Sequence, residues 1–538
     1  MSVERLGPLQ ADARSPRAAI PEGVIYQVYV RSFADGNGDG MGDLLGLTAR
    51  LDHVVRLGVD TLWLNPIHPS GEVDMGYDVT DYWDVDPALG GMEAFDRFLG
   101  EAHRRGLRVL IDFVPNHTSD RHPWFVESRA SRDSPRRGWY CWADPRDGDP
   151  PNNWLSAFRG SAWVWDERTA QYYLASFYPE QPDLNWENPE VRRALGEALR
   201  FWVERGVDGF RLDAVQRLSK DPDLRDNPPR TLSPNDPDAV VLGSLDYPEW
   251  LAQHHVHDQN GPREHEYLRE LRRAAGPDAF LLGEVWHFEL GGVASYLAPD
   301  QLDLAFNFRF SFQPWDARAI GDAVDAVEAT WPEDAWPCYH LSNHDAPRHA
   351  TRYGERAVRP AAVLLLTLRG TPVLYQGEEI GMVDGVVPTE RRRDRAGRDP
   401  CRTPMQWDGS PNAGFCPPDV EPWLPLAPGH EERNVARQAR DPDSVLALYR
   451  RLLALRRSSV ALRRGRYRRL PAPEGCLAYL REAGTERLAV AVNFTSEETA
   501  VALPEGTVAV HTSFREEGEE VRGLYRLGGD QAVVAWAS

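Results

Sequence analysis

The sequence predicts an α/β fold, a (β/α)8 TIM barrel with an inserted subdomain after strand 3 and a C-terminal antiparallel β-sandwich domain. Eight short apolar runs typical of strands alternate with helical patterns between residues 24 and 380. A long polar stretch interrupts the alternation after the third run, and short alternating strands replace it after about residue 461. Repeated strand-helix alternation indicates a parallel sheet covered by helices, and eight such units close a barrel.

The eight strand-like runs follow one another in a regular order. They are "VIYQVYV" (24–30), "TLWLNPI" (61–67), "RVLIDFVPN" (108–116), "DGFRLDAV" (208–215), "AFLLGEVW" (279–286), "LDLAFNF" (302–308), "CYHLSNHD" (338–345) and "PVLYQGEEI" (372–380). Helical patterns such as "LLGLTARLDHVVRLG" (44–58) and "PEVRRALGEALRFWVERG" (189–206) separate them. We therefore expect the chemistry at the carboxyl ends of these strands, where barrel enzymes place it.

Domain boundaries follow from these changes of pattern. We expect an N-terminal arm (1–21), a barrel built from 22–117 and 182–460, an inserted subdomain (118–181) and a C-terminal β domain (461–538). The arm has no apolar core of signal-peptide length and is predicted to be loose. The insertion is rich in Trp and Pro and has few helical signals. The C-terminal runs "CLAYLRE", "LAVAVNF" and "AVVAWA" alternate as antiparallel strands do.

Composition excludes several classes of partner. The formal net charge is -21, which argues against nucleic acid or an anionic membrane, because both require a basic face. The longest apolar run, "AAVLLLTL" from Ala361, is far shorter than the ~20 residues of a membrane span. Five cysteines without metal-ligand spacing indicate reduced thiols. These features predict a cytoplasmic protein that is a monomer or a weak homo-oligomer.

An acidic, glycine-rich loop, "DGNGDGMGD", follows the first strand. Its oxygen donors stand at the alternate positions of a calcium loop: Asp35, Asn37, Asp39, the Met41 carbonyl and Asp43. The twelfth position, where a helix-loop-helix site has a bidentate glutamate, is a glycine, and a strand precedes the loop. The loop is therefore predicted to be a metal site on a different scaffold.

Carboxylates follow three of the predicted strands. The fourth ends in "GFRLD", which places Arg211 and Asp213 on one side of the strand, and the arginine is expected to keep Asp213 ionised. The fifth ends in "LLGEVW", where aromatic and apolar neighbours favour the protonated form of Glu284 that a general acid requires. The seventh adds His344 and Asp345. All would converge over one mouth of the barrel.

Two carboxyl groups in opposite protonation states are the apparatus of glycoside hydrolysis. One attacks the anomeric carbon and the other protonates the leaving oxygen. Acyl transfer through a serine has no nucleophile elbow in this sequence. The residues alone therefore indicate a glycosidase and leave its stereochemistry open, because the separation of the two groups cannot be derived from the sequence.

Four strand-end motifs resemble the α-amylase superfamily, specifically its oligo-1,6-glucosidase and α-glucosidase branch. They are "DFVPNH" (112–117), "GFRLDAV" (209–215), "GEVW" (283–286) and "SNHD" (342–345). The insertion ends in "QPDLNWENP" (181–189), which is similar to the hallmark of that branch rather than of starch-cleaving endo-amylases. The resemblance extends from about Val24 into the C-terminal domain.

The resemblance implies a retaining exo-acting α-glucosidase that works through a covalent glucosyl-enzyme. Asp213 would be the nucleophile, Glu284 the acid and then the base, and Asp345 the carboxylate that binds sugar hydroxyls. Substrate-binding residues implied in the same way are Tyr77, Asp78, His117, Arg211, His344 and Arg402. In this scheme Asp78 and Arg402 grip the non-reducing end, which closes the pocket so that single glucose units are removed.

The resemblance also implies that the glycine-rich loop holds structural calcium, or magnesium, away from the catalytic groups. Three residues depart from the usual pattern, and one of them, Asn65 of "WLNPIHPS", stands near the pocket wall where relatives more usually have serine. Ala214 follows the nucleophile where isomaltose-cleaving relatives often have valine, and the smaller side chain favours α-1,4 or mixed linkage specificity. Ala346 is expected to lie near the leaving group.

Alternatives remain open at this stage. A sucrose isomerase, maltose isomerase, trehalose synthase or glucosyl transferase would use the same carboxylates, with a sugar hydroxyl in place of water resolving the glucosyl-enzyme. A non-catalytic relative that only binds a partner would lose catalytic carboxylates and have a membrane span. This sequence keeps all three carboxylates, and no membrane span is found in it. In each catalytic case the ligand is a small oligosaccharide.

Overall fold

The computed structural model describes residues 15–231, 248–332 and 335–538. Eight parallel strands lie in the order β10-β11-β1-β2-β3-β7-β8-β9. Their bounds are β1 (Ile25–Val28), β2 (Thr61–Leu64), β3 (Arg108–Phe113), β7 (Gly209–Leu212), β8 (Phe280–Gly283), β9 (Leu304–Ala305), β10 (Cys338–His340) and β11 (Thr371–Tyr375). A parallel bridge between Phe306 and Cys338 joins the two outermost strands. The predicted barrel is confirmed, and each predicted run contains one strand.

Helices cover the outside of this barrel. The long ones are α2 (Leu44–Leu57), α3 (Gly91–Arg104), α5 (Pro189–Glu204), α8 (Glu264–Ala275), α11 (Ala317–Thr330) and α13 (Val358–Thr367). Shorter ones are α7 (Pro248–Leu251), α9 (Leu290–Ser295), α10 (Phe308–Ser311), α12 (His349–Tyr353) and α14 (Val435–Gln438). α2 shows how the sequence sets such a helix: the Asp43 side chain accepts the Gly46 N–H at its start, and Gly58 ends it at φ 99°.

The insertion after β3 is small and mixed. It contains α4 (Pro123–Ser128) and an antiparallel sheet in the order β4-β6-β5, with β4 (Trp142–Ala143), β5 (Trp163–Asp166) and β6 (Gln171–Leu174). The short helix α4 lies where few helical signals were found. Backbone bridges from His117 to Asp183 and from Tyr140 to Leu184 tie the end of the insertion to the barrel. This link brings insertion side chains to the barrel mouth.

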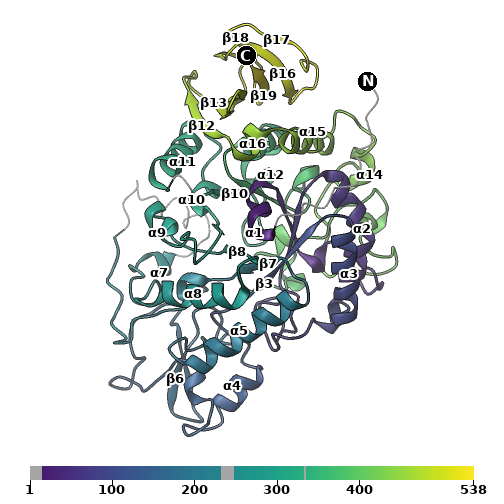
Figure 1. Ribbon diagram of the computed structural model, residues 1–538. Coiled ribbons are helices and arrows are strands. Elements are labelled where there is room, and N and C mark those ends of the chain that lie inside the picture. The colour runs from purple at the N-terminus through teal and green to yellow at the C-terminus, as the bar shows by residue number, and fades with distance from the viewer. Residues whose placement is uncertain (1–14, 232–247, 333–334) are drawn as a thin grey trace.

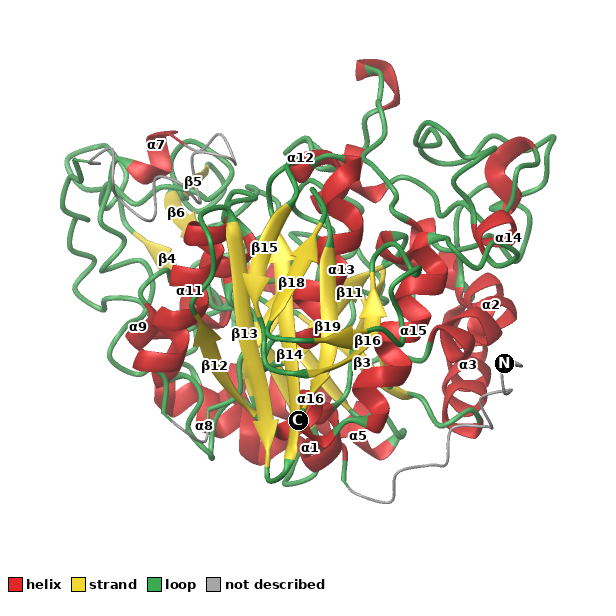
Figure 2. Ribbon diagram, turned by 90° about the horizontal axis from the view of Figure 1, so that it is seen from above, coloured by secondary structure: helices red, strands yellow, loops and turns green. Residues whose placement is uncertain are grey.

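The C-terminal region folds into two antiparallel sheets, as predicted. The larger has the order β12-β13-β14-β19-β16-β17, with β12 (Arg466–Leu470), β13 (Cys476–Ala483), β14 (Glu486–Asn493), β19 (Ala532–Ala537), β16 (Gly506–His511) and β17 (Glu520–Val521). The smaller pairs β15 (Thr499–Ala502) with β18 (Leu524–Leu527). Helices α15 (Val445–Ser458) and α16 (Val460–Arg464) lie between these sheets and the barrel in Figure 1. Figure 2, seen from above, shows the C-terminal strands in front of the barrel.

Buried polar contacts fasten the C-terminal sheets to the barrel. Arg481 of β13 is fully buried and donates to the carbonyls of Thr367, Leu462 and Gly465. In Figure 1 the C-terminal sheets and the insertion lie at opposite ends of the molecule, with the barrel between them. The C-terminal region is therefore placed to brace the barrel, whereas the insertion is placed to shape the mouth.

The predicted N-terminal arm is partly ordered, which corrects the expectation of a loose segment. Residues 16–22 form α1 (Pro16–Ala19) and a 3-10 turn (Ile20–Glu22). The Ile20 side chain is 1% exposed, and the Arg17 guanidinium lies 2.6 Å from a carboxylate oxygen of Asp303. Burial of an apolar side chain and this ion pair explain the order, and residues 1–14 of the arm lie outside the described residues. No described helix is long and apolar enough to span a membrane.

Candidate active site

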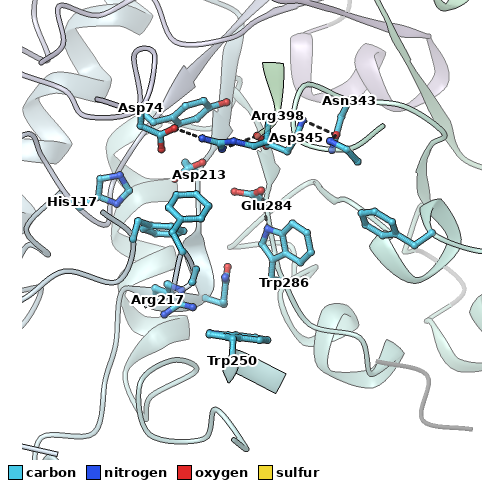
Figure 3. A pocket seen from close by; sticks show the side chains of 17 residues that line it. Asp74, His117, Asp213, Arg217, Trp250, Glu284, Trp286, Asn343, Asp345 and Arg398 are labelled. Carbon is cyan, nitrogen blue, oxygen red and sulfur yellow. Dashed lines mark hydrogen bonds and ion pairs between the residues drawn. The ribbon is translucent and has the colours of Figure 1, made fainter. Parts of the chain in front are cut away.

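One cavity of about 930 Å³, counting its open mouth, lies over the carboxyl ends of the barrel strands. Its lining combines four carboxylates, two arginines, several aromatic rings and other polar groups: Asp74, Asp213, Glu284, Asp345, Arg217, Arg398, Tyr77, Phe158, Phe177, Trp250, Trp286, Phe312, His117, Gln216 and Asn343. Figure 3 shows the labelled members of this set converging on a common space.

Asp213 and Glu284 are held by the same arginine. Arg211 Nη1 lies 2.8 Å from Asp213 Oδ1, and Nη2 lies 3.0 Å from Glu284 Oε2. Arg211 is 2% exposed and also pairs with Asp112 at 2.6 Å. Adjacent strands β7 and β8 supply the two carboxyl groups, so the barrel itself sets their spacing. The structure thus brings the predicted catalytic pair to one point.

The protonation of this pair differs from the sequence-based expectation. We expected Arg211 to keep Asp213 ionised, but burial raises the pKa of Asp213 well above its usual value, and the nearby Glu284 charge raises it further. The Arg211 guanidinium lowers the pKa of Asp213, but by less than burial and the Glu284 charge raise it. Asp213 therefore favours its protonated form in the free enzyme.

Two further donors orient Glu284. The indole Nε1–H of Trp286 donates to Glu284 Oε1 at 2.9 Å, and the Ala214 N–H donates to Oε2 at 3.1 Å. Ala214 has φ 45°, a left-handed conformation that turns its N–H toward the glutamate. Trp286 stacks on Phe308 with ring centroids 4.3 Å apart. Glu284 therefore has little freedom to rotate.

Asp345 is held as an anion. Its Oδ1 accepts from Arg398 Nη1 at 3.0 Å and from Arg402 Nη2 at 2.9 Å. His344 Nε2 lies 3.0 Å from its other oxygen. Burial alone raises the pKa of Asp345, but His344, Arg398 and Arg402 together lower it well below its usual range. Such a fixed charge suits the stabilisation of positive charge that develops on a bound ligand.

Two predicted substrate-binding residues lie behind the cavity rather than in it. The Asp78 carboxylate accepts from the backbone N–H groups of Val73 and Asp74, and Arg402 is fully buried and donates to the His344 carbonyl at 2.7 Å. Asp74 and Arg398 line the cavity instead and form an ion pair there. Asp78 and Arg402 are therefore placed to position Asp74, His344 and Asp345, whereas Asp74 and Arg398 face the space where a ligand would bind.

The remaining predicted polar residues gather at the end of the cavity that Asp74 and Arg398 line, which we call the inner end. The Tyr77 hydroxyl lies 2.6 Å from His344 Nε2, and the two rings stack with centroids 5.5 Å apart. Tyr77 and His117 line the cavity, whereas His344 supports Tyr77 from behind. Burial lowers the pKa of His117 to about 4 and that of His344 well below its usual value, so both are neutral at pH 7.

Gln181 gives the hallmark stretch "QPDLN" a physical role. Its side-chain amide donates to Asp74 Oδ2 at 3.1 Å and lies 3.1 Å from His117 Nε2. Two residues later, Asp183 pairs with Lys220 at 2.7 Å. The end of the insertion thus fixes two cavity residues against the barrel.

In the glycine-rich loop, backbone N–H groups donate hydrogen bonds to the loop's own carboxylates. Asp35 accepts the N–H groups of Gly38 and Gly40, and Asp43 accepts those of Gly36, Asn37 and Gly46. Among the described residues no three or more His, Cys, Asp or Glu side chains form a metal-binding cluster. The donors are nonetheless all oxygens, as a hard cation requires. Burial raises the pKa of Asp43, and the like charge of Asp35 raises it further, a repulsion that a cation would relieve.

Sequence reasoning missed the opposite end of the cavity, which Arg217 and Trp250 line and which we call the outer end. Phe158 and Phe177 come from the insertion, Trp250 from α7, and Gln216 and Arg217 from the 3-10 turn that follows Asp213. No pattern in the sequence singled out these residues. Ala346, expected near the leaving group, does line the cavity.

Comparisons with known proteins agree with this geometry. The family model "Alpha amylase, catalytic domain" matches residues 27–465. A probable alpha-glucosidase of Rhizobium meliloti (strain 1021) is 42% identical, covering 89% of this chain and 90% of the relative. An oligo-1,6-glucosidase of Parageobacillus thermoglucosidasius is 37% identical, covering 90% and 92%.

Solved structures of similar proteins cover almost the whole chain. The alpha-glucosyl transfer enzyme XgtA superposes with a TM-score of 0.88 at 40% identity, covering 96% of this chain and 99% of that one. The trehalulose synthase MutB from Pseudomonas mesoacidophila MX-45 superposes with a TM-score of 0.86 at 35% identity, covering 96% and 98%.

Proposed function

The chain belongs to the alpha-amylase family of glycoside hydrolases, and on that premise we propose that it is a retaining, exo-acting α-glucosidase. It releases α-glucose from the non-reducing end of short α-glucosides. The observation that carries this proposal is the sharing of one guanidinium, that of Arg211, by Asp213 and Glu284 within a single cavity. A nucleophile and an acid held this close face the same glycosidic bond, and retaining enzymes separate them by only about 5 Å.

In the first chemical step Asp213 attacks the anomeric carbon, and Glu284 gives its proton to the leaving oxygen. In the second step Glu284 takes a proton from water, and the water oxygen attacks the anomeric carbon. The bond from this carbon to Asp213 breaks, which frees the Asp213 carboxylate and releases glucose with overall retention. In the proposed cycle a glucoside enters between the two groups, with Asp213 as the attacking anion and Glu284 beside the leaving oxygen.

Exo action follows from how the inner end of the cavity is closed. Asp74, Arg398 and Asp345 form a continuous ion-paired wall there. Each of these groups can also bond a sugar hydroxyl, and we propose that the wall blocks a further sugar at this end. Only a terminal glucose then fits beside Asp213 and Glu284.

Linkage preference rests on Ala214. Its N–H is turned toward Glu284, and its side chain is a single methyl group beside the catalytic pair. Ala214 is 1% exposed and does not itself line the cavity, so a valine there would act by displacing the groups around it. We propose α-1,4 or mixed linkage specificity on this basis.

Incubation with maltose, isomaltose, sucrose and trehalose in separate reactions tests the proposal. Chromatography is expected to show free glucose as the main product from maltose or isomaltose, and proton NMR is expected to show the α-anomer first. Accumulation of a new disaccharide would instead favour glucosyl transfer or isomerisation. That second candidate is supported by the similarity to an alpha-glucosyl transfer enzyme and a trehalulose synthase.

We also propose that the loop from Asp35 to Asp43 binds structural Ca²⁺, or Mg²⁺ in its place. Asp35, Asn37, Asp39, the Met41 carbonyl and Asp43 would supply oxygen ligands, and the ion would pin the loop without touching substrate. Titration of EDTA-dialysed protein with Ca²⁺ or Mg²⁺ is expected to raise its thermal midpoint. An unchanged midpoint, or an equal rise in an Asp39→Asn variant, would contradict the site.

Location and assembly complete the proposal. All five cysteines are free thiols, which supports a reducing compartment, and we place the enzyme in the cytoplasm. We propose a monomer or weak homo-oligomer, because the cavity is built from one chain. Light scattering at micromolar concentration tests this, and a stable larger assembly would contradict it.

A further inference from the structure

The outer end of the cavity contains a buried arginine whose guanidinium has no hydrogen-bond partner among the described residues. Arg217 is 3% exposed and lines the cavity. Within the described part of the chain, its guanidinium makes one ion pair, with Asp258 at 3.7 Å, and one ring contact, over Phe177 at 5.4 Å. A distance of 3.7 Å is too long for a hydrogen bond. The donors of this guanidinium are therefore available to a ligand.

Asp258 compensates the Arg217 charge only in part, because its oxygens are already used. Oδ1 accepts from Asn227 Nδ2 at 3.0 Å, and Oδ2 lies 2.8 Å from His255 Nδ1. The other cavity arginine, Arg398, differs sharply, since it bonds Asp74, Asp345 and Asp394. Of the two cavity arginines, Arg217 is therefore the one whose guanidinium makes no hydrogen bond within the described protein.

Two neighbours of Arg217 in the lining are also unsatisfied. Gln216 Oε1 and Trp250 Nε1 are buried in the described structure without a hydrogen-bond partner. Trp250 is nevertheless fixed, because its ring stacks on His255 at 3.7 Å and 12°. Figure 3 places Arg217 and Trp250 together at the end of the cavity away from Asp74 and Arg398. This is the end that the aglycone would enter.

We infer that the aglycone half of the site takes α-glucosides whose aglycone bears a carboxylate, bound by Arg217. This inference rests on the proposed glucosidase function and names its substrate class. A carboxylate matches the fork of a guanidinium and completes its hydrogen bonds. Aromatic side chains line this half, and their low polarity strengthens the interaction.

Charge selects a carboxylate over a phosphate. One guanidinium balances one negative charge, and Arg217 is the only cationic residue lining this half of the cavity in the described structure. A phosphate dianion would bring surplus charge toward Asp213, Glu284 and Asp345. A neutral sugar aglycone would leave the guanidinium charge only partly compensated by Asp258.

Paired aryl glucosides test the inference. The probes are the 3- and 4-carboxyphenyl α-D-glucosides and the matching neutral carboxamides. We expect the carboxylate-to-carboxamide ratio of kcat/KM to be about 10- to 100-fold higher in the wild type than in Arg217→Gln, which is the range for a hydrogen bond to a charged group. The carboxylate and the carboxamide differ in leaving-group ability, but this difference is the same in both enzymes. Comparing the ratio in wild type with the ratio in Arg217→Gln therefore removes it. The effect is expected mainly in KM.

A matched control and a binding readout separate the possible failures. Arg193→Gln changes an exposed arginine on α5 and is expected to keep the wild-type ratio. Calorimetric dissociation constants in a Glu284→Gln background should show the same carboxylate preference, and Arg217→Gln should remove it. Equal ratios in wild type and Arg217→Gln, in kinetics or in binding, would overturn the inference. Retained carboxylate binding without any glucose release from the wild type would instead overturn the proposed function.

Discussion

The two ends of the cavity differ in how completely the protein satisfies its own charges. At the inner end, Asp74 and Asp345 share Arg398, and the catalytic pair shares Arg211. At the outer end, the Arg217 guanidinium has no hydrogen-bond partner in the described structure. The inner end is preorganised for a constant ligand, a glucose unit, and can stabilise developing charge without rearrangement. The outer end is completed only by its ligand.

The two ends also come from different parts of the fold. Asp213 and Glu284 follow adjacent barrel strands, and Asp345 follows β10, so rigid backbone positions them. The outer end is built by a 3-10 turn, by α7 and by the insertion. This division lets the loops change the aglycone without disturbing the chemistry.

The largest effect is expected from removing the nucleophile. Asp213→Asn keeps the shape of the side chain but cannot form a glucosyl-enzyme, so kcat on maltose should fall by about 10⁴-fold or more. Asp223→Asn, an exposed acid on the loop after the same strand, is the control and should keep wild-type activity. Unchanged activity of Asp213→Asn would contradict the assignment of the chemical step to Asp213 at the inner end.

Breaking the inner wall is expected to be the next most severe change. Arg398→Gln leaves Asp74 buried without its ion pair, and kcat/KM should fall by about 10² to 10³-fold. A double variant with Asp74→Asn should lose less than the sum of the two single losses, because the residues act as a unit. Full additivity in this cycle would show that the wall is not one network.

The inner end should also make stability depend on pH. The pKa of His117 is lowered to about 4 in the fold, against about 6.5 when unfolded, so the unfolded chain binds the proton first as pH falls. The free energy of unfolding should therefore drop between pH 6.5 and 4, by about 2 to 3 kcal/mol from this residue. Urea unfolding of wild type and His117→Asn checks this, and an equally steep fall in the variant would contradict it.

The smallest effect is expected from an orienting residue. Trp286→Phe keeps the stacking on Phe308 but removes the hydrogen bond to Glu284, so kcat should fall about 3- to 10-fold with little change in KM. Trp165→Phe, on the exposed face of the insertion sheet, should have no effect. A change confined to KM would place Trp286 in substrate binding instead.

Sequence reasoning reached the inner end more fully than the outer one, for a physical reason. Strand periodicity and the rule that chemistry follows strand ends located Asp213, Glu284 and Asp345 in one cavity. The same rule did not resolve the loops. The family resemblance led to Asp78 and Arg402, whereas Asp74 and Arg398 line the cavity. The two residues of each pair are close in sequence, and only three-dimensional packing decides which one faces the cavity.

The outer end offered almost no pattern to follow. Arg217 sits in a 3-10 turn that lacks helical or strand periodicity, and Trp250 follows a stretch outside the described residues. The partial order of the N-terminal arm was missed for a similar reason, since Ile20 is buried by segments distant in sequence. Long-range contacts of this kind leave no local signal.

Trapping the covalent intermediate tests the account most directly. Wild-type enzyme treated with 5-fluoro-α-D-glucosyl fluoride is predicted to gain one fluoroglucosyl group, which peptide mass spectrometry should locate on Asp213. A label on another residue, or none while the reagent is turned over, would contradict the assignment of the facing pair.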